Sequence, residues 1–137
     1  MIINGENLIL GRLAAIAAKK ALLGEKIDIV NAEKVVIVGK KSFILRNYKK
    51  KFDRKTPIKG PFIPRTPDRF LRRVIRGMLP YKKERGNNAF KKVMCHVEIP
   101  DNFKNEKLTT FDKINVLNTN NINYLSIGDL CKLLKNV

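Results

Sequence analysis

Two features of the sequence predict an α/β domain with a mainly parallel sheet. Helix-like and strand-like segments alternate along the 137 residues, an order that places helices on the faces of parallel strands. Residues 27–30 and 35–38 are rich in Ile and Val, which is typical of strands that are buried on both faces. Because 44% of the residues are hydrophobic, the chain can bury a core, and its length indicates a single domain over residues 1–137.

The first half of the chain contains two predicted helices. Residues 2–10 are apolar around a Gly-Glu-Asn interruption and predict a short strand or a turn. Residues 11–23 predict a helix because they are rich in Ala and Leu, and Gly24 suits the position just beyond a helix end. Residues 42–52 predict a second helix, which has a basic end.

Residues 68–79 predict a helix with two contrasting faces. At about 100° per residue, its arginines fall within one sector of roughly 100° and its apolar side chains fall opposite them. The arginine face comprises Arg69, Arg72, Arg73 and Arg76, and the apolar face comprises Phe70, Leu71, Val74, Ile75 and Met78. Asp68, after Pro67, is expected to cap the start of the helix, and Gly77 and Pro80 are expected to end it.

The remaining segments predict shorter elements. Residues 83–92 indicate a short basic helix or loop, residues 93–99 a strand that ends at Pro100, and residues 115–117 another short strand. The sequence Ser-Ile-Gly-Asp at 126–129 resembles a capping box at the start of a final helix. The inward face of that helix is expected to comprise Leu130, Leu133 and Leu134.

Positive charge is concentrated in residues 40–92, which we call the basic segment. It holds 19 Lys and Arg against three acidic residues, a net charge of +16 out of +17 for the whole chain. A surface that is only solvated mixes the two signs. We therefore expect the basic segment to bind a polyanion, with nucleic acid favoured over an anionic membrane surface.

Irregular backbone within the basic segment favours RNA over DNA. Four of the six prolines lie in residues 56–67, which predict an extended basic loop. Such loops suit the irregular grooves and junctions of folded RNA, whereas a DNA reader more often has a compact recognition helix and dimer symmetry. A DNA-binding regulator that uses the arginine face remains the alternative. The absence of Trp disfavours a membrane-surface helix.

No motif for catalysis, cofactor binding or a small-molecule substrate is complete. Gly39-Lys40-Lys41-Ser42 follows a predicted strand, but a phosphate loop requires Gly at position 34, where the chain has Lys. His96 alternates with apolar neighbours, which indicates a packed strand histidine, and Cys95 would point to the opposite face. The acidic residues are scattered singly, so we expect neither an enzyme nor a metal site.

The cysteines and the chain start indicate a cytoplasmic protein. Cys95 and Cys131 are too isolated in sequence for a disulfide framework or a zinc cluster, so two buried free thiols in a reducing compartment are expected. The N-terminus lacks the pattern of a signal peptide, and no apolar run is long enough to span a membrane.

Three stretches of the chain form a specific combination. They are GRLAAIAAKKALLGEKIDIVNAEKVVIVGKK at 11–41, GPFIPRTPDRFLRRVIRGMLPYKKERGNNAFKK at 60–92, and the predicted strand up to Pro100. In this order they resemble the L-thirteen family of large-subunit ribosomal proteins, in its archaeal and eukaryotic form. Val38 departs from the family, which often has Thr there, and residues 101–137 match it only loosely.

The resemblance implies a three-layer α/β/α domain with a small, mainly parallel sheet and extended basic loops. It implies no enzymatic activity and no cofactor. It also implies a structural constituent of the large ribosomal subunit, in the cytoplasm, that binds large-subunit rRNA directly and early in assembly. The other implied partners are neighbouring large-subunit ribosomal proteins.

The basic segment is the region of this single domain that is expected to contact RNA. Its side chains would neutralise phosphates and lock RNA segments together. The expected RNA-binding residues are Lys40, Lys41, Lys49, Lys50, Lys51, Arg54, Lys55, Lys59, Gly60, Pro61, Arg65, Arg69, Arg72, Arg73, Arg76, Lys82, Lys83 and Arg85.

Overall fold

A small parallel sheet forms the centre of the molecule. The computed structural model describes residues 1–120 and 122–135. Three parallel strands lie in the order β1 (Ile2–Asn4), β2 (Ile27–Val30) and β4 (Val93–Cys95). All four residues of β2, the middle strand, are buried. The predicted α/β class and the strand at 27–30 are therefore confirmed.

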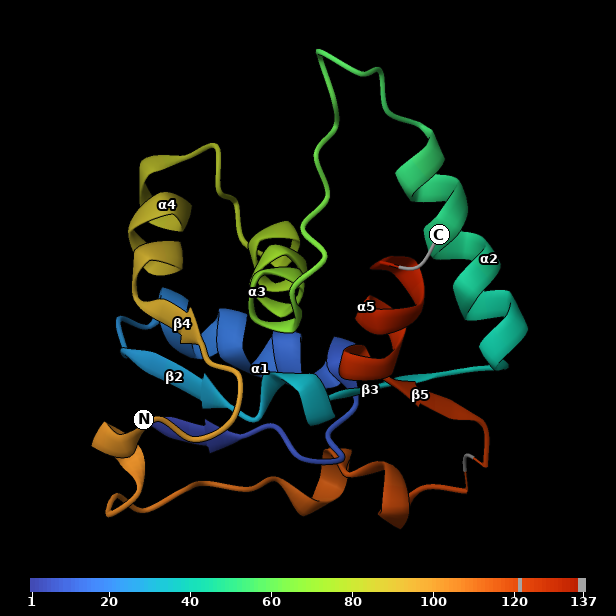
Figure 1. The fold of residues 1–137 in the computed structure, drawn as a ribbon. Helices are drawn as coiled ribbons and strands as arrows, with labels where there is room; N and C mark the ends of the chain where they lie inside the picture. Colours follow the sequence, from blue (N-terminus) through green and yellow to red (C-terminus); the bar gives the residue numbers. More distant parts are fainter. Residues whose placement is uncertain (121, 136–137) are drawn as a thin grey trace.

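One face of this sheet packs against α-helices (Figure 1). Ile3, Ile29 and Cys95 lie side by side across the three strands and belong to the main hydrophobic core. The helices over them are α1 (Leu10–Leu22), α3 (Pro67–Met78) and α4 (Glu84–Lys91). α1 turns a row of small side chains toward the core, which allows close packing: Ala14, Ala17, Ala18 and Ala21.

A chain of short helices runs along the β1 edge of the sheet, below it in Figure 1. These 3-10 helices are η2 (Asp101–Phe103), η3 (Asp112–Ile114) and η4 (Val116–Asn118). The Thr109 N–H donates to the Ile2 carbonyl oxygen at 2.9 Å, and the Asn4 N–H donates to the Thr109 carbonyl oxygen at 3.0 Å. These bonds attach the segment to the free edge of β1.

The prediction of a strand at 115–117 is wrong. Asn115 precedes η4, and its side-chain oxygen accepts a hydrogen bond from the Leu117 N–H at 2.9 Å. This local bond turns the backbone into a helical turn and competes with an extended ladder.

The second predicted strand does not join the parallel sheet. β3 (Val36–Val38) pairs antiparallel with β5 (Tyr124–Ser126) in a separate two-stranded sheet. Asn31 adopts a left-handed conformation with φ of 55°, and the 3-10 helix η1 (Ala32–Lys34) follows it. These turns redirect the chain away from β2, so β3 is only partly buried although its sequence is continuously apolar.

The last two predicted elements are present with changed details. β4 is shorter than the predicted strand at 93–99 because Glu98 has a positive φ of 59°, which bends the chain. α5 (Ile127–Lys135) begins at the predicted capping box: the Asp129 N–H donates to Ser126 Oγ at 3.1 Å, and Ser126 Oγ donates to Asp129 Oδ2 at 2.8 Å. Leu133 is only half-buried, and Cys131 is buried on the inner face.

Within the described ranges, no helix is both long and apolar enough to cross a membrane. Over the same ranges, no three His, Cys, Asp or Glu side chains come together in a way that could hold a metal ion.

Candidate nucleic-acid interface

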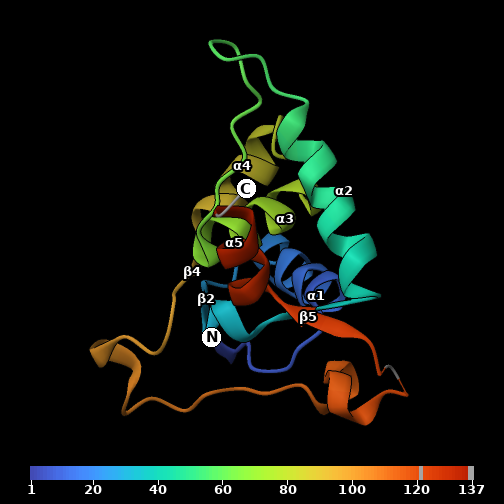
Figure 2. The ribbon, with the colours of Figure 1, turned by 45° about the vertical axis from the view of Figure 1, so that its right-hand side comes forward.

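The basic segment forms the side of the molecule opposite residues 101–118 (Figures 1 and 2). It comprises α2 (Lys41–Asp53), α3, α4 and the connections between them. The connection at 54–66, which we call the loop, extends well away from the body of the protein in both views. α1 and the sheet support α3 and α4 from below, whereas α2 packs against α5 and β5.

α3 carries the arginine face, as predicted. Phe70, Leu71 and Ile75 are buried on its inner side. Met78 was predicted to be buried as well, but its side chain is 43% exposed because Leu79, just beyond the helix end, takes the buried position. The prediction that Asp68 caps the helix is wrong. The helix begins at Pro67, so Thr66 occupies the N-cap position and Asp68 lies in the first turn.

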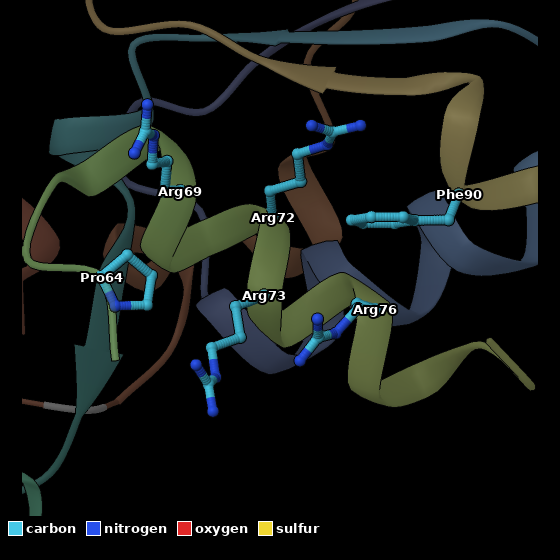
Figure 3. Close-up of a pocket in the computed structure, with 6 residues that line it drawn as sticks. All are labelled: Pro64, Arg69, Arg72, Arg73, Arg76 and Phe90. Atoms are coloured by element: carbon cyan, nitrogen blue, oxygen red, sulfur yellow. The ribbon is translucent and has the colours of Figure 1, made fainter. Parts of the chain in front are cut away.

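Four arginines, with Pro64 and Phe90, line a shallow depression of about 400 Å³, which we call the arginine pocket (Figure 3). The arginines are Arg69, Arg72, Arg73 and Arg76. In Figure 3, Arg69 and Arg72 point to one side of α3, and Arg73 points to the other side. The lining contains no carboxylate, so this depression is suited to an anion with several oxygens.

Arg72 is held in place by two contacts with other elements. Its Nε donates to the Val93 carbonyl oxygen at 3.0 Å, which connects α3 to β4. Its guanidinium carbon lies 4.5 Å from the centroid of the Phe90 ring on α4, and Figure 3 shows this ring directed toward Arg72. The Nη groups are left to bind an anion in an orientation that is already fixed.

Other cations of the basic segment rest on aromatic rings in the same way. The Arg76 guanidinium lies 5.1 Å from the Tyr81 ring, and the Arg65 guanidinium lies 5.2 Å from the Phe52 ring. Arg73 instead uses Nη1 to donate to the Phe62 carbonyl oxygen at 2.9 Å. This bond ties the loop to α3.

No Lys or Arg of the basic segment forms an ion pair within the described residues. Two of its three acidic residues, Asp68 and Glu84, lie in the first turns of α3 and α4. Acidic groups there stabilise the positive end of the helix dipole. The positive charge of this surface is therefore left without internal compensation.

The loop folds back on itself near its tip. The Thr56 N–H donates to the Gly60 carbonyl oxygen, and the Gly60 N–H donates to the Thr56 carbonyl oxygen, each at 3.1 Å. Gly60 has φ of 79°, and its peptide bond to Pro61 is cis. A side chain at Gly60 would lie 3.0 Å from Phe62, so glycine is needed there. Ile58, at the tip, is 89% exposed.

The structure brings most of the sequence-predicted residues to this side. Nine of them are exposed at the end of α2, in the loop, in the α3–α4 connection and at the start of α4: Lys49, Lys50, Lys51, Arg54, Lys55, Lys59, Lys82, Lys83 and Arg85. Lys40 and Lys41 are not near them. They lie at the opposite end of α2, about 15 Å along the helix axis from Lys51 at ~1.5 Å per residue.

Sequence reasoning missed the residues that shape this surface. Phe90, Tyr81 and Phe52 support arginines. Their positions in the sequence do not indicate this, because each ring meets its arginine only in the folded structure. Gly86 was missed too. A Cβ at Gly86 would lie 2.1 Å from the Pro80 carbonyl oxygen, so α4 can approach the α3–α4 connection only with glycine at this position.

The remaining candidate groups do not line the arginine pocket: the two cysteines lie in the core, and His96 is half-buried just beyond the end of β4. Cys95 and Cys131 are buried free thiols, and burial raises the pKa of Cys95 to about 12 and that of Cys131 to about 11. His96 Nε2 lies 3.4 Å from Asp28 Oδ1, and its ring packs edge-on against Phe103. As predicted, these groups are packed within the fold.

The chain matches a known protein family. The family model described as "Ribosomal protein L13" matches residues 1–102. Relatives named "Large ribosomal subunit protein uL13" include those of Methanococcus maripaludis and Methanocaldococcus jannaschii, which are 44% and 46% identical to the chain. These alignments cover 98% and 97% of the chain, and 96% of each relative. The uL13 of Methanopyrus kandleri is 48% identical over 72% of the chain and 62% of its own length.

Proposed function

The chain belongs to the ribosomal protein L13 family, and from this premise we propose that its basic segment is the surface that binds large-subunit rRNA. As a family member it is a structural constituent of the large ribosomal subunit, it is not an enzyme, and it resides in the ribosome of the cytoplasm. The family match and the three relatives give no support to the DNA-binding alternative.

One observation carries the proposal: the basic segment has a net charge of +16, yet none of its Lys or Arg is paired with a carboxylate among the described residues. Because these cations are neither buried nor paired with acidic groups of the chain, they are available to bind a polyanion outside it. Binding to RNA phosphates releases condensed counterions and so lowers the free energy of the complex.

The proposed contacts divide into two kinds. The lysines at the end of α2, in the loop and before α4 are exposed and flexible donors that would follow the phosphate backbone. The arginine pocket is oriented in advance by Phe90, Tyr81 and two backbone carbonyl oxygens. It would therefore hold phosphates in one arrangement and position RNA segments relative to each other.

We propose that all of the predicted residues contact RNA and that they form two separate groups in the structure. Lys40 and Lys41 stand apart from the others and would reach a different RNA segment from the one at the arginine pocket. The whole chain would act as one domain in which the sheet and α1 hold α3 and α4 in place, and α5 and β5 hold α2. Neighbouring large-subunit proteins would be the second class of partner, and binding would occur early in assembly.

The test is a binding titration of large-subunit rRNA fragments against duplex DNA of equal length over a range of salt concentrations. We expect tight binding to specific rRNA fragments, with the logarithm of the affinity falling steeply as the logarithm of the salt concentration rises. Equal affinity for duplex DNA and every rRNA fragment would contradict the proposal. Crosslinking in cells followed by RNA sequencing then identifies the contacted nucleotides.

A further inference from the structure

A second depression lies in the basic segment, between α2, α3 and the loop. Tyr48, Phe70, Ile63 and Val74 form its walls, and Lys51 and Arg73 complete its lining, around a volume of about 220 Å³. We call it the aromatic pocket. It differs from the arginine pocket because its walls are mainly rings and aliphatic side chains, although the two pockets share Arg73.

The walls of the aromatic pocket are held by contacts from three elements. The Tyr48 and Phe70 rings are 5.3 Å apart between centroids and are tilted by 56°. Tyr48, Ile63 and Val74 are half-buried and pack against the main core. The hydrogen bond from Arg73 to the Phe62 carbonyl oxygen holds the residue before Ile63 against α3, so the loop wall is fixed to the helix.

The cations of this pocket indicate the charge of its ligand. Lys51 Nζ lies 4.7 Å from the centroid of the Tyr48 ring. Arg73 is within reach of both pockets, and no carboxylate lines either of them. The ligand should therefore combine a flat apolar body with a negative charge beside it, and this is the chemistry of a nucleotide.

Resting on the proposed function, we infer that the aromatic pocket receives one unpaired base of the rRNA, while Lys51 and Arg73 hold the phosphate of the same nucleotide. A base within an RNA duplex cannot enter such a pocket, because its faces are stacked and its edges are paired. The nucleotide would come from a loop, bulge or junction, and its neighbouring phosphates would occupy the arginine pocket through the shared Arg73. The protein would thus recognise a strand with one base turned out.

The experiment distinguishes the contribution of the base to binding from that of the phosphates. The probes are a ten-nucleotide single-stranded oligoadenylate and an abasic ribose-phosphate strand of the same length and charge, and the measurement is the affinity of each at several salt concentrations. Tyr48→Leu removes the stacking ring, and Val74→Phe fills the pocket while every cation is kept. Tyr124→Leu changes an exposed tyrosine on β5, outside the basic segment, and is the matched control.

We expect the wild-type protein and Tyr124→Leu to bind oligoadenylate about tenfold more tightly than the abasic strand, as stacking of one base on an aromatic side chain allows. In Tyr48→Leu and Val74→Phe this preference should disappear, while the salt dependence and the affinity for the abasic strand stay unchanged. The melting temperature and the circular dichroism spectrum of each variant report whether it is folded.

The inference is overturned if the folded Val74→Phe variant keeps the full preference for bases, which would indicate that the pocket takes another ligand, such as an apolar side chain of a neighbouring protein. It is also overturned if the wild-type protein does not distinguish the two strands. In both cases a steep salt dependence of binding would leave the proposed function standing. Failure of the wild-type protein to bind either strand would also overturn the inference, and only failure to bind the rRNA fragments as well would contradict the proposed function itself.

Discussion

The two regions of this protein treat their charges in opposite ways. Outside residues 40–92 the net charge is +1, and the three Lys–carboxylate ion pairs among the described residues lie there, as in Lys20–Glu25 and Lys34–Glu6. In the basic segment the cations instead contact rings and backbone carbonyl oxygens, as Arg72 does with Phe90 and Val93. Such contacts orient a cation without neutralising it.

This difference shows that the two regions have different roles. One region supports the charged surface, and the other presents it to a ligand. The scaffold compensates its charge internally and buries the core, so it can fold while carrying a surface of repelling cations. The basic segment is oriented by weak contacts and left with unpaired charge, so its interaction energy is available to an external polyanion. The following predictions test this division, from the largest expected effect to the smallest.

The largest effect is expected from replacing all four arginines of the arginine pocket. We expect the quadruple variant with Gln at positions 69, 72, 73 and 76 to bind rRNA about a thousandfold more weakly, because each lost charged hydrogen bond costs roughly 1 kcal/mol of binding free energy. Its salt-dependence slope should fall by about four, one for each lost phosphate contact. Circular dichroism and titration calorimetry with one rRNA fragment measure both outcomes. An unfolded variant with unchanged RNA affinity would show that the arginines serve the scaffold.

The next largest effect is expected at Gly86, where α4 packs against the α3–α4 connection within the basic segment. Gly86→Ala should lower the free energy of unfolding by about 3 kcal/mol, because the added methyl group collides with the backbone at Pro80. Gly77→Ala is the matched control: a Cβ there meets nothing within 4 Å, and the change should stabilise α3 by up to about 1 kcal/mol. Urea unfolding measures both. Equal effects would contradict the close approach of α4.

A smaller effect should distinguish two arginines on the same face. Arg72→Gln should lower the free energy of unfolding by about 1 kcal/mol, because it loses its contacts with Val93 and Phe90. Arg69 is exposed, so Arg69→Gln should change stability by less than about 0.5 kcal/mol. Both should reduce the salt-dependence slope of RNA binding by about one. If the two variants are equally stable, the contacts of Arg72 do not anchor it.

The smallest effect at ordinary pH is expected from the core thiols. Burial raises the pKa of Cys95 and Cys131 above the usual 9.0, so the folded state favours their neutral forms. Their contribution to stability is complete below pH 9 and is lost as the pH rises from 9 toward about 12 for Cys95. Urea unfolding should show full stability at pH 7, a small loss at pH 9, where half of the unfolded-state thiols are ionised, and a clear loss at pH 10.5. The double variant Cys95→Ala, Cys131→Ala should lack this thiol-dependent loss, and an equal loss in both proteins would contradict its assignment to the thiols.

Local patterns were enough to predict the helices and the charged surface. The Ala-rich run of α1, the two faces of α3 and the capping box of α5 depend on residues within a few positions of each other. The concentration of charge depends on composition alone. By contrast, β5 has three residues without a strand pattern, and its pairing with β3 depends on a partner more than 80 positions away.

The candidate site divides in the same way. Its arginines and lysines were found from the sequence, because a helical repeat places side chains on one face whatever surrounds the helix. Their aromatic supports were not found: Phe90 reaches Arg72 only because α4 packs beside α3, and Gly86 matters only because Pro80 lies against it. Likewise, Lys41 and Lys51 belong to one basic run, yet the length of α2 separates them.

The sequence by itself determined the helices, the excess of positive charge and the absence of a complete catalytic motif, because each follows from neighbouring residues or from composition. Only the tertiary structure decided that β3 leaves the parallel sheet, that rings and carbonyl oxygens orient the arginines, and that an aromatic pocket adjoins them. These features arise where segments distant in sequence pack together, and packing depends on the shape of the whole core.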